Sequence, residues 1–232
     1  MAEHYELGFI GAGNMAEGIA TGILQQKVLT PAQIIASDPL EARRALFAEQ
    51  FGVTTTDDNQ RVVTEAHCVM LAIKPQSFDE VMAPLAGAIT ADHVLISIMA
   101  GMSTERIAAI APGISARVVR VMPNLPIRLG AGVAGMVAGR HARQQDVTLA
   151  QRLFDAGGQS VVVTDEALLD AVTAVSGSGP AYFYYVVEAM TAGGVAAGLT
   201  AEDAQKLAEY TCLGAARMMI ETGEPPAELR RK

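Results

Sequence analysis

Short apolar segments alternate with longer amphipathic ones along most of the chain, and this alternation restricts the fold more than any other feature of the sequence. Apolar and β-branched runs bounded by Gly, Pro, Asn or Asp predict buried strands, and the segments between them have the periodicity of helices. Strands that alternate with helices build βαβ units, whose parallel sheet is covered by helices on both faces. The sequence therefore predicts an α/β fold with a doubly wound parallel sheet.

The apolar segments and the amphipathic segments each give a set of expected elements. We expect strands at residues 5–11, 33–38, 68–75, 93–101 and 116–124, with two further apolar segments, 131–139 and 160–165, that extend the sheet. We expect helices of the sheet domain at residues 14–26, 40–52, 77–89, 103–112 and 144–157.

Strand signals stop at residue 166, and three helical patterns follow at residues 166–175, 181–197 and 201–221. Thr200 and Asp203 have the spacing of a capping box at the start of the last of these helices. We therefore expect two domains, a sheet domain over residues 1–164 and an all-helical domain over residues 165–232.

Composition narrows the class of protein. The formal net charge of −8 disfavours nucleic acid and anionic membranes as partners. Cys68 and Cys212 lie far apart in apolar surroundings, which indicates buried core residues and no metal site. The N-terminus shows no export signal, and no apolar run approaches the ~20 residues that a membrane span needs. We expect a cytoplasmic protein.

A glycine-rich turn, Gly11-x-Gly13-x-x-Ala16, directly follows the first expected strand and opens the first expected helix. Gly11 allows a tight turn, and Gly13 lets a pyrophosphate approach the backbone. Ala16 permits close packing of the helix on the sheet, and the helix N-terminus favours an anion. In this strand–turn–helix context, the motif predicts dinucleotide binding.

The end of the second strand leaves the choice of nicotinamide cofactor open. Asp38 can accept hydrogen bonds from a ribose 2′-hydroxyl, or it can cap the helix that follows. Ser37 can donate to a phosphate, and Arg43 and Arg44 lie close by in sequence. We therefore expect NADP or NAD, without deciding between them.

The residues that follow the carboxyl ends of the other expected strands predict a ligand-binding cleft rather than an active site with a nucleophile. Lys74 and Pro75 follow a buried strand at the edge where ligands of α/β sheets collect, and the next two strands end at the same edge. No Ser-His-Asp or Cys-His set is suggested, and none is needed where a nicotinamide carries the chemistry.

The segment Ser-Gly-Ser-Gly-Pro at residues 176–180 interrupts an apolar run directly before a helix. It is either a hinge between two helices or an anion-binding turn. Pro180 suits the first turn of a helix, where its missing N–H has no intrahelical role. The amides of such a turn can hold a carboxylate without a basic side chain.

Several motifs in order along the chain, GFIGAGNMAEGI, AIKPQ, SIMAGMS, VMPNLP, AVSGSGPAYFYYVVEAM and ETGEPPAELRRK, resemble those of the pyrroline-5-carboxylate reductase family. The resemblance implies NAD(P)H-dependent reduction of the cyclic imine 1-pyrroline-5-carboxylate to L-proline, in proline biosynthesis. It also implies an N-terminal Rossmann domain and a C-terminal helical substrate and dimerisation domain, so that the protein forms a homodimer or a larger homo-oligomer.

The resemblance also implies roles for individual residues. The pyrophosphate site would comprise Ile10, Gly11, Ala12, Gly13, Asn14 and Met15, and the adenosine ribose would lie by Ser37, Asp38 and Asn59. The rest of the cofactor would border Ala72, Ile73, Lys74, Pro75, Ile98, Met99 and Ala100. Asn124 would lie near the nicotinamide, and Ser176, Ser178 and Gly179 would position the substrate carboxylate.

The sequence departs from the family pattern at three places. Met99 stands where the family commonly has a small residue, Leu125 stands where it has Thr, and Asp38 stands where NADPH-using members are often uncharged. Family members also continue into a Ser-Pro-Gly-Gly-Thr-type motif, so we expect the chain to be C-terminally incomplete. Two alternatives stay open, a non-catalytic nucleotide-binding protein and another β-hydroxyacid dehydrogenase-like oxidoreductase.

Overall fold

The computed structural model describes residues 5–232. The chain divides into two compact units, the first ending at Gly177 and the second comprising Ser178–Lys232. The first unit therefore extends beyond the boundary near residue 164 that the change in sequence character predicts. The domain boundary near residue 164 stays a prediction, and the division after Gly177 describes how the chain packs.

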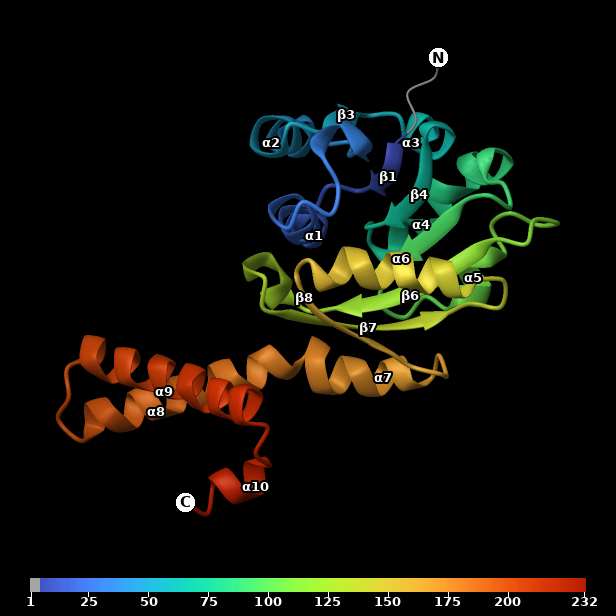
Figure 1. Ribbon diagram of the computed structural model, residues 1–232. Helices are drawn as coiled ribbons and strands as arrows, with labels where there is room; N and C mark the ends of the chain where they lie inside the picture. Colours follow the sequence, from blue (N-terminus) through green and yellow to red (C-terminus); the bar gives the residue numbers. More distant parts are fainter. Residues whose placement is uncertain (1–4) are drawn as a thin grey trace. The chain divides into compact units, whose positions relative to one another are not determined.

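The first unit is built on one eight-stranded sheet with the order β3-β2-β1-β4-β5-β6-β7-β8 (Figure 1). Its strands are β1 (Tyr5–Ile10), β2 (Ile34–Ser37), β3 (Thr54–Thr56), β4 (Ala66–Leu71), β5 (Val94–Ser97), β6 (Arg117–Pro123), β7 (Gly132–Ala138) and β8 (Gly158–Val162). The first six are parallel to one another, which confirms the expected doubly wound arrangement.

Strand β7 runs antiparallel to β6, and this differs from the expected all-parallel sheet. The connection between the two strands holds only a short 3₁₀ turn, η4 (Leu125–Leu129), whereas a parallel crossover needs a dozen or more residues. The longer connection through α6 (Gln144–Asp155) then returns β8 parallel to β7.

Alternate residues of the strands point to opposite faces of the sheet and fill two separate cores. Leu7 and Phe9 of β1 belong to one core, together with residues of α1 (Asn14–Gln25), α2 (Glu41–Phe51) and α6. Ile10 belongs to the other, with residues of α3 (Asn59–Glu65), α4 (Phe78–Met82) and α5 (Thr104–Ala108). Helices cover both faces, as the strand composition predicts.

Two elements were not expected from the sequence, the edge strand β3 and helix α3. Strand β3 consists of three half-buried threonines and lacks an apolar run. Asp58 caps α3 by accepting a hydrogen bond from the Gln60 amide at 2.8 Å, and the helix buries Val62 and Val63. The only sequence signal for α3 was a capping residue before a short segment, which is weaker than the apolar periodicity that predicts the longer helices.

Glycines let two backbones approach closely where β7 and β8 begin. Gly158 has φ +151°, and a Cβ on it would lie 1.9 Å from the carbonyl oxygen of Gly132. A Cβ on Gly132 would lie 2.6 Å from the Cα of Ile127 in η4. No side chain larger than hydrogen fits at either position without moving the backbone.

The first unit ends in helix α7 (Leu168–Val172) and a π-helical turn, Thr173–Gly177. Val172 packs over Gly135 of β7, where a Cβ would come within 2.5 Å of the valine side chain. The last residues of this unit are thereby fixed to the sheet by packing. The expected helix at residues 166–175 thus continues into a widened turn that carries Ser176.

The second unit consists of helices α8 (Gly179–Ala196), α9 (Ala201–Thr222) and α10 (Pro226–Leu229). The Thr200 hydroxyl accepts a hydrogen bond from the Asp203 amide at 3.1 Å, which confirms the predicted cap of α9. Within residues 178–232, all of which the structure describes, the buried hydrophobic residues are Ala204 and Ala208. No helix among residues 5–232 is long and apolar enough to cross a membrane.

Candidate active site

The glycine turn has the geometry that the sequence predicts. Gly11 has φ +96°, and a Cβ on it would lie 2.7 Å from the Ala72 carbonyl oxygen, so only glycine fits. Gly13 is the residue before α1, and a Cβ there would meet no heavy atom of the described residues within 4 Å. Packing within the chain therefore does not require glycine at position 13. The open space lies in front of the unpaired first-turn amides of α1, where a pyrophosphate can approach.

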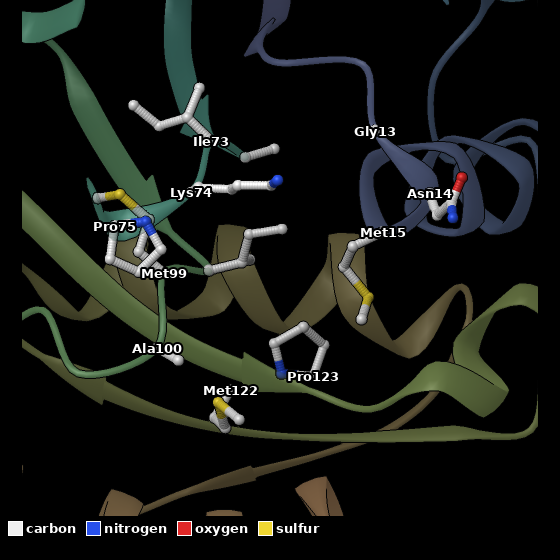
Figure 2. Close-up of a pocket in the computed structure, with 12 residues that line it drawn as sticks. Gly13, Asn14, Met15, Ile73, Lys74, Pro75, Met99, Ala100, Met122 and Pro123 are labelled. Carbon is white, nitrogen blue, oxygen red and sulfur yellow. The ribbon is translucent and has the colours of Figure 1, made fainter. Parts of the chain in front are cut away.

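An open pocket of about 330 Å³ lies beside this turn, entirely within the first unit (Figure 2). It is lined at the ends of four neighbouring strands and at the start of α1 by Gly13, Asn14, Met15, Ala72, Ile73, Lys74, Pro75, Ile98, Met99, Ala100, Met122 and Pro123. The structure thus brings together the cofactor-site residues predicted after β4 and β5 with three of those predicted at the glycine turn. Of the latter set, Gly13, Asn14 and Met15 line the pocket, and Ile10, Gly11 and Ala12 do not. Met122 and Pro123 were missed, although the strand exit that they form had been noted.

The walls of the pocket are largely apolar, and Lys74 is the cationic side chain among the residues that line it. Figure 2 shows this side chain extending from the end of β4 toward Asn14 and Met15 in the first turn of α1. Its ammonium group therefore adds positive charge on the side of the pocket where the helix dipole is also positive. This combination suits a phosphate-bearing ligand.

Asp38 braces the glycine turn. One carboxylate oxygen accepts a hydrogen bond from the Ala12 amide at 2.9 Å, and the other accepts from the Leu40 amide at 2.9 Å. The helix-cap interpretation is wrong, because α2 begins at Glu41 with Leu40 as its N-cap, and the Leu40 amide that Asp38 holds lies before the helix. A contact between Asp38 and a ribose stays a prediction.

Ser37 is fully buried, with its hydroxyl 2.6 Å from Asn59 Oδ1 and 3.1 Å from the carbonyl oxygen of Phe9. Because it has no accessible surface, it cannot donate to a phosphate in this arrangement, contrary to the sequence-based expectation. Asn59 is half-buried and keeps its side-chain NH₂ group for a ligand. Any sugar contact at this corner is therefore better assigned to Asn59 than to Ser37.

The two arginines after Asp38 are engaged with the same corner. Arg43 Nε donates to the Ala12 carbonyl at 2.6 Å, and its Nη2 pairs with Glu17 of α1 at 2.8 Å. Arg44 Nη1 donates to the carbonyls of Asp38 and Pro39 at 2.8 and 2.9 Å. Arg43 therefore holds the backbone of the glycine turn, and Arg44 holds the backbone between β2 and α2.

Asn124 follows β6 and is 7% exposed. Its Nδ2 donates to the Ser176 carbonyl at 3.1 Å, and its Oδ1 accepts from the Val133 amide at 2.9 Å. The side chain therefore joins β7 to the π-helical turn, although its neighbour Pro123 lines the pocket. Proximity of Asn124 to a nicotinamide stays a prediction, and its observed contacts are those of a brace.

The Ser-Gly-Ser-Gly-Pro segment is helical on both sides of one residue, Ser178. The Ser176 hydroxyl donates to the Val172 carbonyl at 2.9 Å inside the π-helical turn. The second unit begins with exposed Ser178, whose side chain makes no capping hydrogen bond with the described residues, and α8 starts at Gly179. A Cβ on Gly179 would meet no heavy atom of residues 5–232 within 4 Å outside its own helix turn. Intrachain packing therefore does not explain the glycine.

Glu166 lies between β8 and α7 and receives three hydrogen bonds. The Thr104 amide and hydroxyl donate at 2.8 and 2.7 Å, and Arg120 Nη1 donates at 2.9 Å. Burial acts to raise the pKa of the Glu166 carboxyl, but the hydrogen bonds from Thr104 and Arg120 outweigh it and lower the pKa below its usual value. The carboxylate is therefore ionised at neutral pH. No pattern in the sequence pointed to this residue.

Clusters of three or more His, Cys, Asp or Glu side chains that could hold a metal ion do not occur among residues 5–232.

Comparisons with known proteins agree with this geometry. Residues 166–232 match a family model described as pyrroline-5-carboxylate reductase dimerisation, and residues 6–101 match one described as NADP oxidoreductase, coenzyme F420-dependent. The pyrroline-5-carboxylate reductase of Haemophilus influenzae is 43% identical over 220 residues, which are 94% of this chain and 80% of that protein. The Synechocystis enzyme of the same name is 41% identical over 98% of this chain and 84% of its own length.

Solved structures give the same result. The pyrroline-5-carboxylate reductase of Coxiella burnetii superposes with a TM-score of 0.92 at 34% identity, covering 99% of this chain and 84% of that one. The Plasmodium falciparum pyrroline carboxylate reductase, solved with NADP bound, shares the fold with a TM-score of 0.85 at 24% identity, covering 100% of this chain and 84% of its own. The resemblance that the motifs carried is confirmed, and the chain belongs to the pyrroline-5-carboxylate reductase family.

Proposed function

We propose that this protein reduces 1-pyrroline-5-carboxylate to L-proline with NADH or NADPH. The observation that carries the proposal is family membership over nearly the whole chain, at about 40% identity to enzymes of that name. The pocket at the carboxyl edge of the sheet supports it, because the residues that line it suit a dinucleotide.

The residues around the pocket suit a nicotinamide cofactor. The turn at Gly11 and the open approach at Gly13 suit the pyrophosphate, with Lys74 adding charge beside them. The apolar walls at Met99, Met122 and Pro123 suit a nicotinamide ring and exclude water from its face. A bound dihydronicotinamide supplies a hydride, which is the chemistry that no side chain of the protein can provide.

We place the carboxylate of the substrate at the segment from Ser176 to Gly179. Ser178 presents an exposed hydroxyl, and a Cβ on the buried Gly179 would meet no heavy atom of the described residues within 4 Å outside its own helix turn. The first-turn amides of α8 suit an anion at this position. The imine of the substrate is protonated before it reacts, so a hydride added to its carbon yields the amine without a further acid. The protein's task is then to hold the two reacting carbons close together.

The matched family model is described as a dimerisation region, and the finer proposal is a cytoplasmic homodimer formed through α8 and α9. These helices expose large apolar side chains, among them Phe183, Tyr185 and Ile220. An exposed apolar surface of this kind is typical of an interface. The free cysteines Cys68 and Cys212 are consistent with a reducing compartment.

The test is a steady-state assay of the purified protein with 1-pyrroline-5-carboxylate and each dihydronicotinamide, with proline identified as the product. A Gly11→Ala variant is the matched control, because its Cβ obstructs the glycine turn and leaves the second unit unchanged. Cofactor binding by the purified protein without any turnover would reject the proposal and favour a non-catalytic nucleotide-binding protein.

A further inference from the structure

We infer that Glu166 is a positioning residue for the reduction, because it ties the start of the segment leading to Ser176 to the loop that lines the cofactor pocket. The inference rests on the proposed function, in which that segment holds the substrate. Glu166 itself does not line the pocket, so it would act only through the backbone that it fixes.

The tie is built from a complete set of hydrogen bonds. One oxygen of Glu166 accepts from the Thr104 amide and from Arg120, and the other accepts from the Thr104 hydroxyl, all at 2.7–2.9 Å. The partners are buried, with Thr104 9% and Arg120 8% exposed. Hydrogen bonds to an ionised group in such surroundings are among the stronger ones in proteins.

Thr104, which donates two of the hydrogen bonds to Glu166, lies close in sequence to the wall of the pocket. It is the first residue of α5 and follows the loop that begins with Ile98, Met99 and Ala100, three residues that line the pocket. A Cβ on Gly139, just after β7, would lie 3.0 Å from the Thr104 Cβ, so the threonine is closely packed against the strand ends. Glu166 is therefore attached to a closely packed residue four positions after Ala100, the last residue of this loop that lines the pocket.

The opposite end of the same segment has a second tie. Asn124 directly follows Pro123 of the pocket wall, and its side chain donates to the Ser176 carbonyl at 3.1 Å. Between the two ties, the hydroxyls of Thr173 and Ser176 donate to carbonyls one turn back, at 2.8 and 2.9 Å. Residues 166–176 are thus hydrogen-bonded at both ends to groups next to the pocket, with Leu169 and Val172 packed against the first unit between them. Removing Glu166 leaves this packing and one of the two hydrogen-bonded ties.

The experiment compares Glu166→Ala and Glu166→Gln with the matched control Glu105→Gln. Glu105 lies next to Thr104 on α5 but is exposed, so the control removes the same charge without breaking the tie. For each variant, kcat and KM for 1-pyrroline-5-carboxylate are measured beside the dissociation constant of NADPH. Amide hydrogen exchange at residues 173–179 reports the order of the segment directly.

We expect Glu166→Ala to lower kcat/KM for the imine by about tenfold, the size of effect expected from losing a charge-assisted bond. The dissociation constant of NADPH should stay within about twofold, because the glycine turn does not contact Glu166. Exchange at residues 173–179 should accelerate. Glu166→Gln keeps an acceptor for the Thr104 amide and should fall between Glu166→Ala and wild type, while Glu105→Gln should match wild type.

Three results would overturn the inference. One is unchanged kcat/KM in Glu166→Ala, and another is an equal loss of NADPH affinity, which would indicate loosening of the whole sheet unit. The third is activity that falls only as far as the folded fraction falls, measured by thermal melts. If wild type does not turn over the imine, the proposed function fails instead, and the exchange measurement still decides whether Glu166 orders residues 173–179.

Discussion

The two units of the chain differ most in what they bury. The first unit places Phe9, Phe47 and Phe154 in its core with 1% exposure or less. The second exposes Phe183 by 57% and Tyr185 by 72%, and its buried hydrophobic residues are two alanines. Because apolar burial is the main favourable term in folding, the first unit carries its own stability. We expect the second to gain much of its stability from association.

The largest effect should come from truncating one phenylalanine in each unit. Phe9 packs edge-on against Phe47 with ring centroids 6.2 Å apart, so Phe9→Ala should cost about 3–5 kcal/mol of unfolding free energy. Phe183→Ala should cost less than about 1 kcal/mol at protein concentrations where the subunits are dissociated. Denaturant titrations at several protein concentrations measure both. A large, concentration-independent cost for Phe183→Ala would break the contrast.

The next effect compares two glycines with opposite surroundings. Gly11→Ala forces a side chain into left-handed backbone and against the Ala72 carbonyl, so the affinity for NADPH should fall by at least about tenfold. Gly179→Ala meets open space, so stability should change by less than about 0.5 kcal/mol while KM for the imine rises. Calorimetric titration and steady-state kinetics separate the two. Loss of cofactor affinity in Gly179→Ala would return residues 176–180 to the hinge interpretation.

A charge placed on the exposed apolar surface of the second unit should show whether that surface forms a subunit interface. Ile220 on α9 is 82% exposed, so Ile220→Glu should leave the folded chain intact and shift the solution mass toward the monomer. Gln205→Glu places the same charge on a polar position of the same helix and should leave the mass unchanged. Analytical ultracentrifugation measures both. An equal shift in the two variants would indicate a general charge effect rather than an interface at Ile220.

Acid should weaken the first unit through Glu166. Since the pKa of its carboxyl is lowered in the folded state, its ionised form stabilises the fold above the ordinary pKa of 4.5, and this contribution is lost as pH falls through the lowered value. The difference in unfolding free energy between wild type and Glu166→Gln should therefore be largest near neutral pH and shrink on acidification. A difference that stays constant down to low pH would show that ionisation is irrelevant to the tie.

The smallest expected effect concerns the thiol inside the sheet. Burial, followed by the nearby Asp146 carboxylate, raises the pKa of Cys68 to about 12. Cys68 should therefore resist alkylation at mildly alkaline pH until the first unit unfolds. Mass spectrometry of labelled peptides measures this, and rapid labelling of Cys68 in the native protein would contradict the buried core described above.

The sequence predicted the elements that depend on local pattern and missed features that depend on long-range contacts. The strand exits that form the pocket were predictable, because parallel strands bring their carboxyl ends to one edge. The direction of β7 depends on the length of a turn, and β3 on pairing with β2. The tie between Glu166 and Thr104 joins residues 62 positions apart, and no periodicity reports such a contact.

The sequence also could not predict in which direction the polar side chains of the candidate site point. The family resemblance placed Ser37 and Asn124 near the cofactor. The structure turns Ser37 inward to Asn59 and Asn124 toward Ser176. Both polar groups satisfy partners that only the folded chain supplies, since buried polar atoms need hydrogen bonds.

The close approach of the backbones at Gly132 and Gly158 determines how the protein tolerates mutations at these two positions. Any base change that replaces either glycine adds a Cβ at a place where a backbone atom of another strand or turn lies within 2.7 Å. Conservative and radical replacements should therefore be almost equally harmful there, unlike at core positions, where the size of the new side chain sets the damage. In a library of single substitutions, these two codons should stand out as sites where every replacement is selected against alike.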